Sequence, residues 1–164
     1  MTTTTRTSDM GVQLVRFVRN FKSLQAQMGH RARHGVDPSA YPVLVQLVES
    51  PKRTTELATC LHADTSTVSR QVTALVDVGF VERRADPEDR RATILVATEA
   101  GIAAYDEMRA GRERMLARIL AGWTDEEVQQ LVSVLSRFND DFEVARPAVL
   151  ADLNELIHER SEEH

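Results

Sequence analysis

Residues 54–97 read TTELATCLHADTSTVSRQVTALVDVGFVERRADPEDRRATILVA, and this stretch decides the fold. Thr54 and Asp64 are each placed to cap a short helix, and apolar residues follow both at helical spacing. A tight connection at His62 joins the two helices, and Gly79 is typical of the position that follows a helix. The apolar face comprises Leu57, Ala58, Leu61, Val68, Val72, Leu75 and Val76. Helix, three-residue turn and helix predict a helix-turn-helix.

A β-hairpin is expected directly after this motif. Residues 80–84 and 93–97 read as two short strands, and the polar segment ADPEDRRA between them contains a proline, which is typical of a turn. A hairpin at this place is the wing of a winged helix-turn-helix. We therefore predict a fold that is mainly α with a small β-hairpin wing.

Helices are expected over most of the remaining chain. Only 5% of the residues are aromatic whereas 42% are hydrophobic, and an aliphatic core suits helices better than a large sheet. Thr124 and Glu127 form a T-x-x-E capping box, and Pro147 is expected to begin a further helix or to kink this one. The predicted divisions are a disordered tail at 1–8, dimerisation helices at 9–34 and 123–164, a winged helix-turn-helix lobe at 35–98 and a connecting helix at 99–122.

Composition and charge exclude several classes of protein. No apolar run approaches the length of a membrane span, the first ten residues are polar, and a single cysteine excludes an internal disulfide framework. These features predict a cytoplasmic protein. The net charge of −5 is concentrated after the hairpin, where residues 93–164 carry seven basic and fifteen acidic side chains. Residues 52–92 are neutral overall, so local basic clusters there can attract phosphate.

The run TTELATCLHADTSTVSRQVTALVDVGFVERRADPEDRRATILVATEAG resembles the MarR family of bacterial regulators. It is similar to the family pattern ELA…STVSR…L…G-[FL]-V-x-R…DPxDRR…LT-x-x-G over about 45 residues. Two positions depart from that pattern, because His62 stands where the turn often has Gly and Ala97 where the strand often ends in Leu. The resemblance implies a homodimeric repressor that binds a pseudo-palindromic operator and is released by a small ligand or, in some members, an oxidant.

Apolar residues also recur at helical spacing over residues 12–28 and 131–157. They carry more hydrophobic surface than a lobe of about 45 residues can cover. Pairing of two chains about a two-fold axis would bury this surface and set two recognition helices one DNA turn apart, roughly 34 Å. The sequence therefore predicts a homodimer.

The second helix of the motif is expected to enter the major groove with its N-terminus first. Hydroxyl side chains and free backbone N–H groups at the start of this helix suit phosphate. Arg70 can form a bidentate pair with guanine, and Gln71 can do so with adenine. The positions expected to be exposed are Thr65, Ser66, Thr67, Ser69, Arg70, Gln71 and Thr73.

Arg90 and Arg91 lie near the tip of the wing, where arginine suits the electronegative minor groove of A·T-rich DNA. In the resembling family an Asp and an Arg of this turn pair to shape it. Here that implies Asp89 with Arg91, which leaves Arg90 free to reach the groove. Arg83 and Arg84 flank the base of the wing as candidates for phosphate contacts. The alternative is a solvated loop whose acidic residues neutralise the arginines.

The resemblance further implies a pocket between the lobe and the dimerisation helices for a small aromatic or anionic effector. A basic side chain there would meet the anionic group. The candidate residues are Met28, His30, Arg31, Tyr41, Leu44 and Tyr105. The alternative for each is a place in the core or on the solvated surface.

Two further features have chemical potential. Cys60 is the only thiol, and we expect it to pack as a small buried side chain rather than to sense oxidants. His30 and His34 have the i, i+4 spacing that can hold one metal ion, with His158 or His164 as a third ligand. Two interleaved arginines oppose this reading, and basic residues near a helix C-terminus have their own electrostatic benefit. We expect neither a metal nor a cofactor.

Two other classes of function are the alternatives. An enzyme is not expected, because the sequence has no Gly-rich phosphate loop, no G-x-S-x-G, no H-E-x-x-H and no Cys-x-x-Cys motif. A winged helix that serves only protein interaction is the other alternative, since a fold does not determine a function. Arg70, Arg90 and Arg91 favour double-stranded DNA, because a protein-binding module has no need of them.

Overall fold

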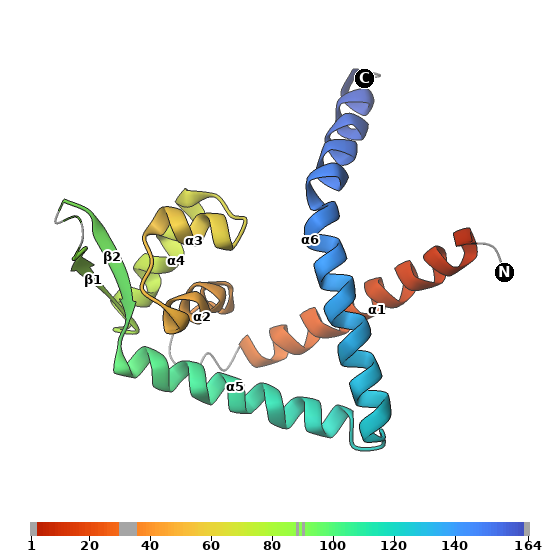
Figure 1. Cartoon of the computed structure of the whole chain (residues 1–164), viewed down its shortest axis with the longest axis horizontal. Coiled ribbons are helices and arrows are strands. Elements are labelled where there is room, and N and C mark those ends of the chain that lie inside the picture. Colours follow the sequence, from red (N-terminus) through yellow and green to blue (C-terminus); the bar gives the residue numbers. More distant parts are fainter. Residues whose placement is uncertain (1–2, 30–35, 88, 90, 163–164) are drawn as a thin grey trace. The chain divides into compact units, whose positions relative to one another are not determined.

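The computed structural model describes residues 3–29, 36–87, 89 and 91–162, and side chains within 7–24, 36–87, 89 and 91–155. The chain forms two compact units, Met1–Gly111 and Arg112–His164. In chain order the elements are α1 (Thr3–Gly29), the 3-10 helix η1 (Pro38–Ala40), α2 (Tyr41–Glu49), α3 (Thr54–Cys60), α4 (Thr65–Asp77), β1 (Val81–Ala85), β2 (Thr93–Ala97), α5 (Glu99–Ile119) and α6 (Asp125–Glu162) (Figure 1). This order confirms a mainly helical fold with one small hairpin.

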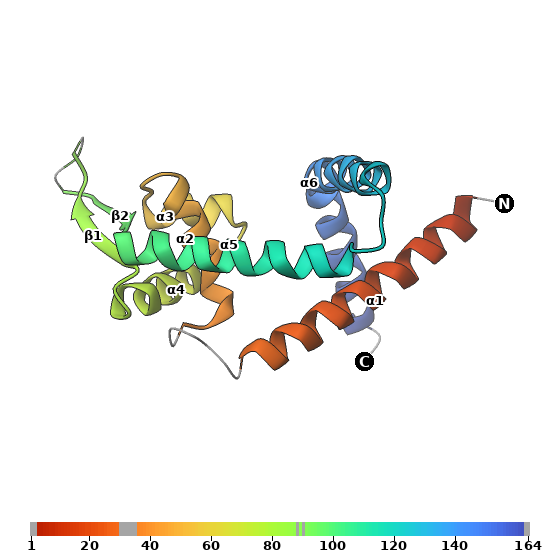
Figure 2. The same cartoon turned by 90° about the horizontal axis from the view of Figure 1, so that it is seen from below.

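The hairpin stands at the edge of the group formed by α2, α3 and α4 in both views (Figures 1 and 2). Its strands are antiparallel, with Ala85 opposite Thr93, and β1 is shifted by one residue from the predicted 80–84. A third segment joins the sheet through a single bridge. The Lys52 N–H donates to the Leu95 carbonyl at 3.2 Å, and the Leu95 N–H donates back at 2.9 Å. The segment that immediately precedes α3 in the chain is therefore hydrogen-bonded to β2.

The core of the first unit includes side chains from α2, α3, α4 and the hairpin. Its fully buried members are Val36, Val43, Leu44, Leu57, Val68, Val72, Leu75, Val81 and Leu95. Of the apolar face expected for the helix-turn-helix, Leu61 and Val76 are only half-buried, and they pack against this core. Because these aliphatic side chains are buried within a single chain, the lobe has a core that does not depend on a partner.

The connection between α3 and α4 is tight because His62 has a φ of +47°. This left-handed conformation costs a residue other than glycine about 1–2 kcal/mol. It allows the Ala63 N–H to donate to the Ala58 carbonyl at 3.0 Å, which closes the turn. The structure therefore gives a physical reason why glycine would suit the position of His62.

The end of α4, the end of the hairpin and the start of α5 are joined by hydrogen bonds. Gly79 has a φ of +78°, and the Phe80 N–H donates to the Leu75 carbonyl at 2.9 Å, as in a Schellman motif. The Thr98 hydroxyl donates to the Gly79 carbonyl at 2.7 Å and accepts the Gly101 N–H at 3.1 Å. Thr98 thus caps α5 and fixes it against the turn that leads into the wing.

The second unit contains the end of α5 and all of α6. The Thr124 N–H donates to Glu127 Oε2 at 2.8 Å, and the Glu127 N–H donates to Thr124 Oγ1 at 3.3 Å, which confirms the capping box. Of the two outcomes expected at Pro147, the start of a further helix is wrong, because α6 continues through this residue, and a kink stays a prediction. A proline removes one backbone hydrogen bond, and the turns on either side of Pro147 maintain the helix.

α1 begins at Thr3, so residues 3–8 are helical rather than a disordered tail. Threonine is a weaker helix former than alanine by up to about 0.7 kcal/mol, yet it does not end a helix as proline does. Neither proline nor glycine occurs before Gly11, so no local signal interrupts the helix. Within the described ranges, none of the helices is both long enough and apolar enough to cross a membrane.

Candidate DNA-binding interface

α4 presents a polar face to solvent. Its apolar side chains Val68, Val72 and Leu75 are buried in the core, so the opposite side of the helix carries hydroxyl groups and one arginine. The predicted DNA-facing residues that are exposed are Thr65, Ser66, Ser69, Arg70 and Thr73, whereas Thr67 and Gln71 are half-buried. Five of the seven predicted positions therefore share one accessible surface.

Arg70 is the basic residue on this face. Its Nη2 atom donates to Thr67 Oγ1 at 3.3 Å. A guanidinium has five N–H donors, and one long bond to a hydroxyl is easily exchanged for a stronger acceptor. Arg70 can therefore turn towards the edge of a guanine with little loss.

Gln71 has a different position from the one predicted. Its Nε2 atom donates to the backbone carbonyl of Ser39 at 2.9 Å, so this side chain joins α4 to η1. Ser39 is in turn held by Asp37, whose carboxylate accepts the Ser39 N–H at 2.7 Å. That hydrogen bond lowers the pKa of Asp37 below its usual value. Gln71 lies at the border between the polar and apolar faces of α4, and to read adenine it would have to release Ser39.

The loop of the wing is held by two carboxylates. Asp89 Oδ1 accepts the Arg91 N–H at 3.1 Å, and Asp86 Oδ1 accepts the Asp89 N–H at 3.4 Å. Asp89 thus contacts the backbone of Arg91, an exposed residue, and the implied pairing of the two residues stays a prediction. Arg90 lies outside the described residues, so its role stays a prediction.

The two arginines of β1 are exposed at the base of the wing. Arg83 Nη2 donates weakly to Thr73 Oγ1 at 3.5 Å, which places this guanidinium beside α4. Arg84 forms an ion pair with Glu82 on the same strand. Arg83 is therefore close to the recognition helix, whereas the charge of Arg84 is partly neutralised.

Arg53 and Asp86 form an ion pair that the sequence did not predict. The Nε and Nη2 atoms of Arg53 donate to Asp86 Oδ2 at 2.9 and 2.5 Å. This carboxylate raises the pKa of Arg53 above its usual value. The one local signal is weak: a basic residue directly before a helix is unfavourable to the helix dipole unless it has a partner. The partner is 33 residues away, which no local pattern reports.

Three of the effector-site candidates belong to the core. Leu44 is fully buried, and Tyr41 and Tyr105 are half-buried and pack against the same cluster. The side chains outside the described residues are those of Met28, His30 and Arg31. An effector pocket therefore stays a prediction from the resemblance.

Cys60 is exposed, which corrects the prediction of a buried side chain. α3 is seven residues long, and only Leu57 and Ala58 are buried. Cys60 is the last residue of this short helix and does not share the buried face.

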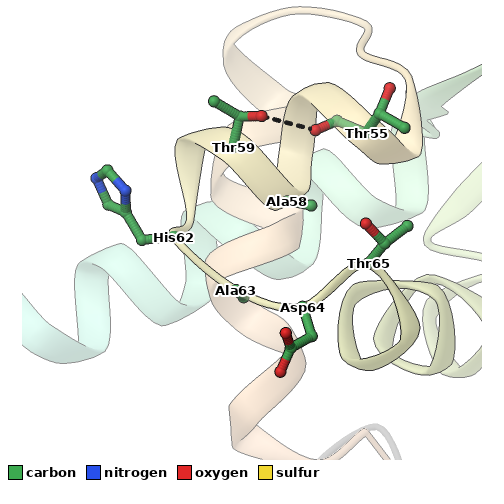
Figure 3. A pocket seen from close by; sticks show the side chains of 7 residues that line it. All are labelled: Thr55, Ala58, Thr59, His62, Ala63, Asp64 and Thr65. Carbon is green, nitrogen blue, oxygen red and sulfur yellow. Dashed lines mark hydrogen bonds between the residues drawn. The ribbon is translucent and has the colours of Figure 1, made fainter. Parts of the chain in front are cut away.

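A polar depression lies at the turn between α3 and α4 (Figure 3). It is lined by Thr55, Ala58, Thr59, His62, Ala63, Asp64 and Thr65. The Thr59 hydroxyl donates to the Thr55 carbonyl at 3.1 Å, and the His62 ring points away from the other side chains (Figure 3). Sites for small aromatic ligands have mostly apolar walls, so this depression is unlike one.

No group of three or more His, Cys, Asp or Glu side chains in the described ranges is arranged to hold a metal ion. The histidine side chains outside these ranges are those of His30, His34, His158 and His164.

The helix-turn-helix, the hairpin that follows it and the polar face of α4 define a winged helix-turn-helix protein. A model of the MarR family matches residues 34–92. The chain is 29% identical over 134 residues to the HTH-type transcriptional regulator YxaD of Bacillus subtilis (strain 168), covering 79% of this chain and 90% of YxaD. It is 27% identical over 119 residues to the HTH-type transcriptional repressor MdtR of the same organism, covering 71% and 77% of the two chains.

A solved structure of a MarR family protein from Bacillus stearothermophilus has the same fold, with a TM-score of 0.68 and 21% identity. The match covers 83% of this chain and 97% of that one. The match of residues 34–92 to the family model, together with relatives that are transcriptional regulators, supports a MarR family winged-helix transcriptional regulator.

Proposed function

We propose that this protein is a repressor that binds a pseudo-palindromic DNA operator as a homodimer. The observation that carries the proposal is the exposed polar face of α4 next to a hairpin that bears exposed arginines. The match to the MarR family model supports DNA binding, and the related MdtR is a repressor.

α4 is the element proposed to read bases. Because its N-terminal residues carry hydroxyl groups and its first backbone N–H groups have no partner within the helix, this end suits phosphate. Arg70 stands one turn further along on the exposed face and is the residue proposed to pair with guanine. Arg83 lies beside Thr73 and is the proposed contact to the phosphates that flank this groove.

The wing is proposed to enter the adjacent minor groove. Arg91 is exposed, and the carboxylates of Asp86 and Asp89 stabilise the loop that carries it. A loop that is ordered before binding loses less entropy when it meets DNA. Arg90 is proposed from the sequence as a second contact in this groove.

The apolar surface of α1 and α6 supports a second copy of the chain. On α1, Val15 and Phe17 are 70% and 64% exposed, and on α6, Val134 and Phe142 are 66% and 50% exposed. Contiguous exposed apolar surface of this kind marks an interface in a soluble protein. Other exposed residues of the same two helices are Val12, Val18, Phe21, Leu131, Leu135, Phe138, Leu150 and Leu153.

Selection of bound duplexes from random DNA, followed by salt-dependent gel shifts on the selected site, tests this function. We expect a palindromic site, and an affinity that falls steeply with salt because phosphate contacts release counterions. Arg137→Ala on α6 is the matched control for loss of an arginine. Arg137 forms an ion pair across one helical turn, from its Nε atom to Asp141 Oδ2 at 3.6 Å. Selection of no duplex would contradict DNA binding, and a site without two-fold symmetry would contradict a dimer.

Release by a small aromatic or anionic ligand is the part of the proposal that rests on the resemblance alone. Benzoate is a suitable first probe, because it combines an aromatic ring with one negative charge. We expect it to displace the protein from its operator at millimolar concentration, and failure of a panel of such anions would count against this part only.

A further inference from the structure

The Arg53–Asp86 pair joins the start of the helix-turn-helix to the wing. Arg53 directly precedes α3, and Asp86 directly follows β1. Among the described residues, Asp86 is the buried charged side chain, with 7% of its surface exposed. A buried carboxylate is costly unless a cation and hydrogen bonds compensate it, and Arg53 supplies two N–H groups to one of its oxygens.

The other oxygen of the same carboxylate organises the loop. Asp86 Oδ1 accepts the Asp89 N–H at 3.4 Å, and the Asp86 N–H donates to the Ala92 carbonyl at 3.0 Å, beyond the last paired residues of the two strands. Asp86 therefore contacts the loop with one oxygen and Arg53 with the other. Any movement of the loop relative to α3 has to break or bend these bonds.

Arg53 itself is held on both sides. Its backbone N–H donates to Glu56 Oε2 at 2.6 Å, which caps the start of α3. The preceding residue, Lys52, is bonded to Leu95 of β2, and its ammonium donates to the Gln46 carbonyl at 2.8 Å. The guanidinium thus extends from a fixed point of the backbone, so it can transmit the position of α3 to the wing.

We propose that Arg53 is a positioning residue for DNA binding, whose pair with Asp86 sets the angle at which the wing leaves the helix-turn-helix. This inference rests on the proposed function, in which α4 and the wing occupy adjacent grooves of one duplex. With α4 in the major groove, the angle decides whether the wing arginines reach the neighbouring minor groove.

A direct phosphate contact is the competing role for Arg53, since its side chain is 42% exposed. The two roles predict opposite effects of Asp86→Asn. If only charge matters, loss of a carboxylate near DNA tightens binding and also releases Arg53 towards phosphate. If the pair positions the wing, the same substitution loosens the loop and weakens binding.

The test measures the dissociation constant for the selected operator by fluorescence anisotropy at fixed salt. We expect Asp86→Asn and Arg53→Lys each to weaken binding about tenfold, because residues that share one hydrogen-bond network are energetically coupled. Lysine keeps the charge but lacks the forked donors, so a phosphate contact would largely survive that change. Arg137→Ala on α6 serves again as the control with unchanged affinity. Equal or tighter binding by Asp86→Asn would overturn the inference.

A second measurement separates positioning from a general loss of structure. The first background is a protein that carries both Arg90→Ala and Arg91→Ala. There, adding Arg53→Lys should lower the operator affinity less than about twofold, because the wing no longer contributes contacts to be positioned. In an Arg70→Ala protein the full tenfold effect should remain. If Arg53→Lys lowered the operator affinity by the same factor in both of these proteins, the inference would be overturned.

Amide hydrogen exchange of the free protein gives a readout that does not depend on DNA. Arg53→Lys should speed exchange at Asp89 and Ala92 while leaving α4 unchanged, and unchanged exchange in the loop would overturn the inference. Wild-type protein that selects no duplex would overturn both the inference and the proposed function. Wild-type binding with unaffected variants would overturn the inference alone.

Discussion

The winged lobe and the terminal helices use the same apolar residue types in opposite ways. In the lobe, Val72 and Leu75 of α4 are at most 1% exposed, whereas Val15 of α1 and Val134 of α6 are 70% and 66% exposed. The lobe therefore has a core that one chain completes. The apolar side chains of the terminal helices are exposed, and the proposed dimer would bury them.

The lobe and the segment that follows it also differ in net charge. Residues 52–92, which contain the helix-turn-helix and most of the wing, are neutral and include the exposed residues Arg70, Arg83, Arg84 and Arg91, whereas residues 93–164 have a net charge of −8. Acidic surface repels DNA, so residues 93–164 disfavour the approach of a duplex, whereas residues 1–34, with six Arg or Lys and one acidic side chain, do not. The comparison predicts that substitutions in the lobe affect folding or DNA contacts, and that substitutions on the terminal helices affect assembly.

The largest effect is expected in the core of the lobe. Leu75→Ala should lower the free energy of unfolding by about 2–5 kcal/mol, because it removes a fully buried side chain and leaves a cavity. Urea denaturation followed by circular dichroism measures this. Leu75→Met is the volume-conserving control, with an expected loss below about 1.5 kcal/mol. An equal loss in both variants would show that the core is not closely packed.

The matching substitution on a terminal helix should act on assembly instead. Leu135→Asp on α6, where Leu135 is 46% exposed, should give a monomer in light scattering while the lobe stays folded. Because a dimer binds both half-sites at once, operator affinity should fall at least about 100-fold. A monomeric wild-type protein would break the comparison, since the apolar faces would then need another explanation.

A smaller effect is expected at the DNA-facing surface. Arg70→Ala should weaken binding to the selected operator by about 1–3 kcal/mol, because one bidentate pair with guanine is lost. It should also relax specificity at one base pair, whereas Arg90→Ala should lower affinity across many sequences. Gel shifts with single-base variants of the operator separate these outcomes, and unchanged affinity in both proteins would contradict the assignment of the interface.

The smallest effect concerns the turn between α3 and α4. His62→Gly should stabilise the lobe by about 0.5–1 kcal/mol, since relief of the left-handed conformation exceeds the added entropy of the unfolded chain. Thermal unfolding measures the change. Ala103→Gly, in the second turn of α5, is the control for glycine alone and should cost about 1 kcal/mol. Destabilisation by His62→Gly would show that the imidazole contributes contacts of its own.

Much of the fold could be predicted because its signals are local. The spacing of apolar residues located the two helices of the motif, and Thr124 and Gly79 occupy the capping positions expected of them. Such signals involve residues at most a few positions apart, so a linear pattern contains them. The errors at α1 and Pro147 arose where polar residues or a proline were read as the end of a helix that continues.

The amino-acid sequence by itself determined the order of the main helices and strands, the fold class and the resemblance to the MarR family. Only the tertiary structure decided which polar groups meet: Arg53 with Asp86, and Gln71 with Ser39. These partners are 33 and 32 residues apart, and each pair depends on how helices and hairpin pack around the shared core. Packing likewise decided that Cys60 faces solvent. Secondary structure follows from neighbours along the chain, whereas side-chain partners follow from neighbours in space.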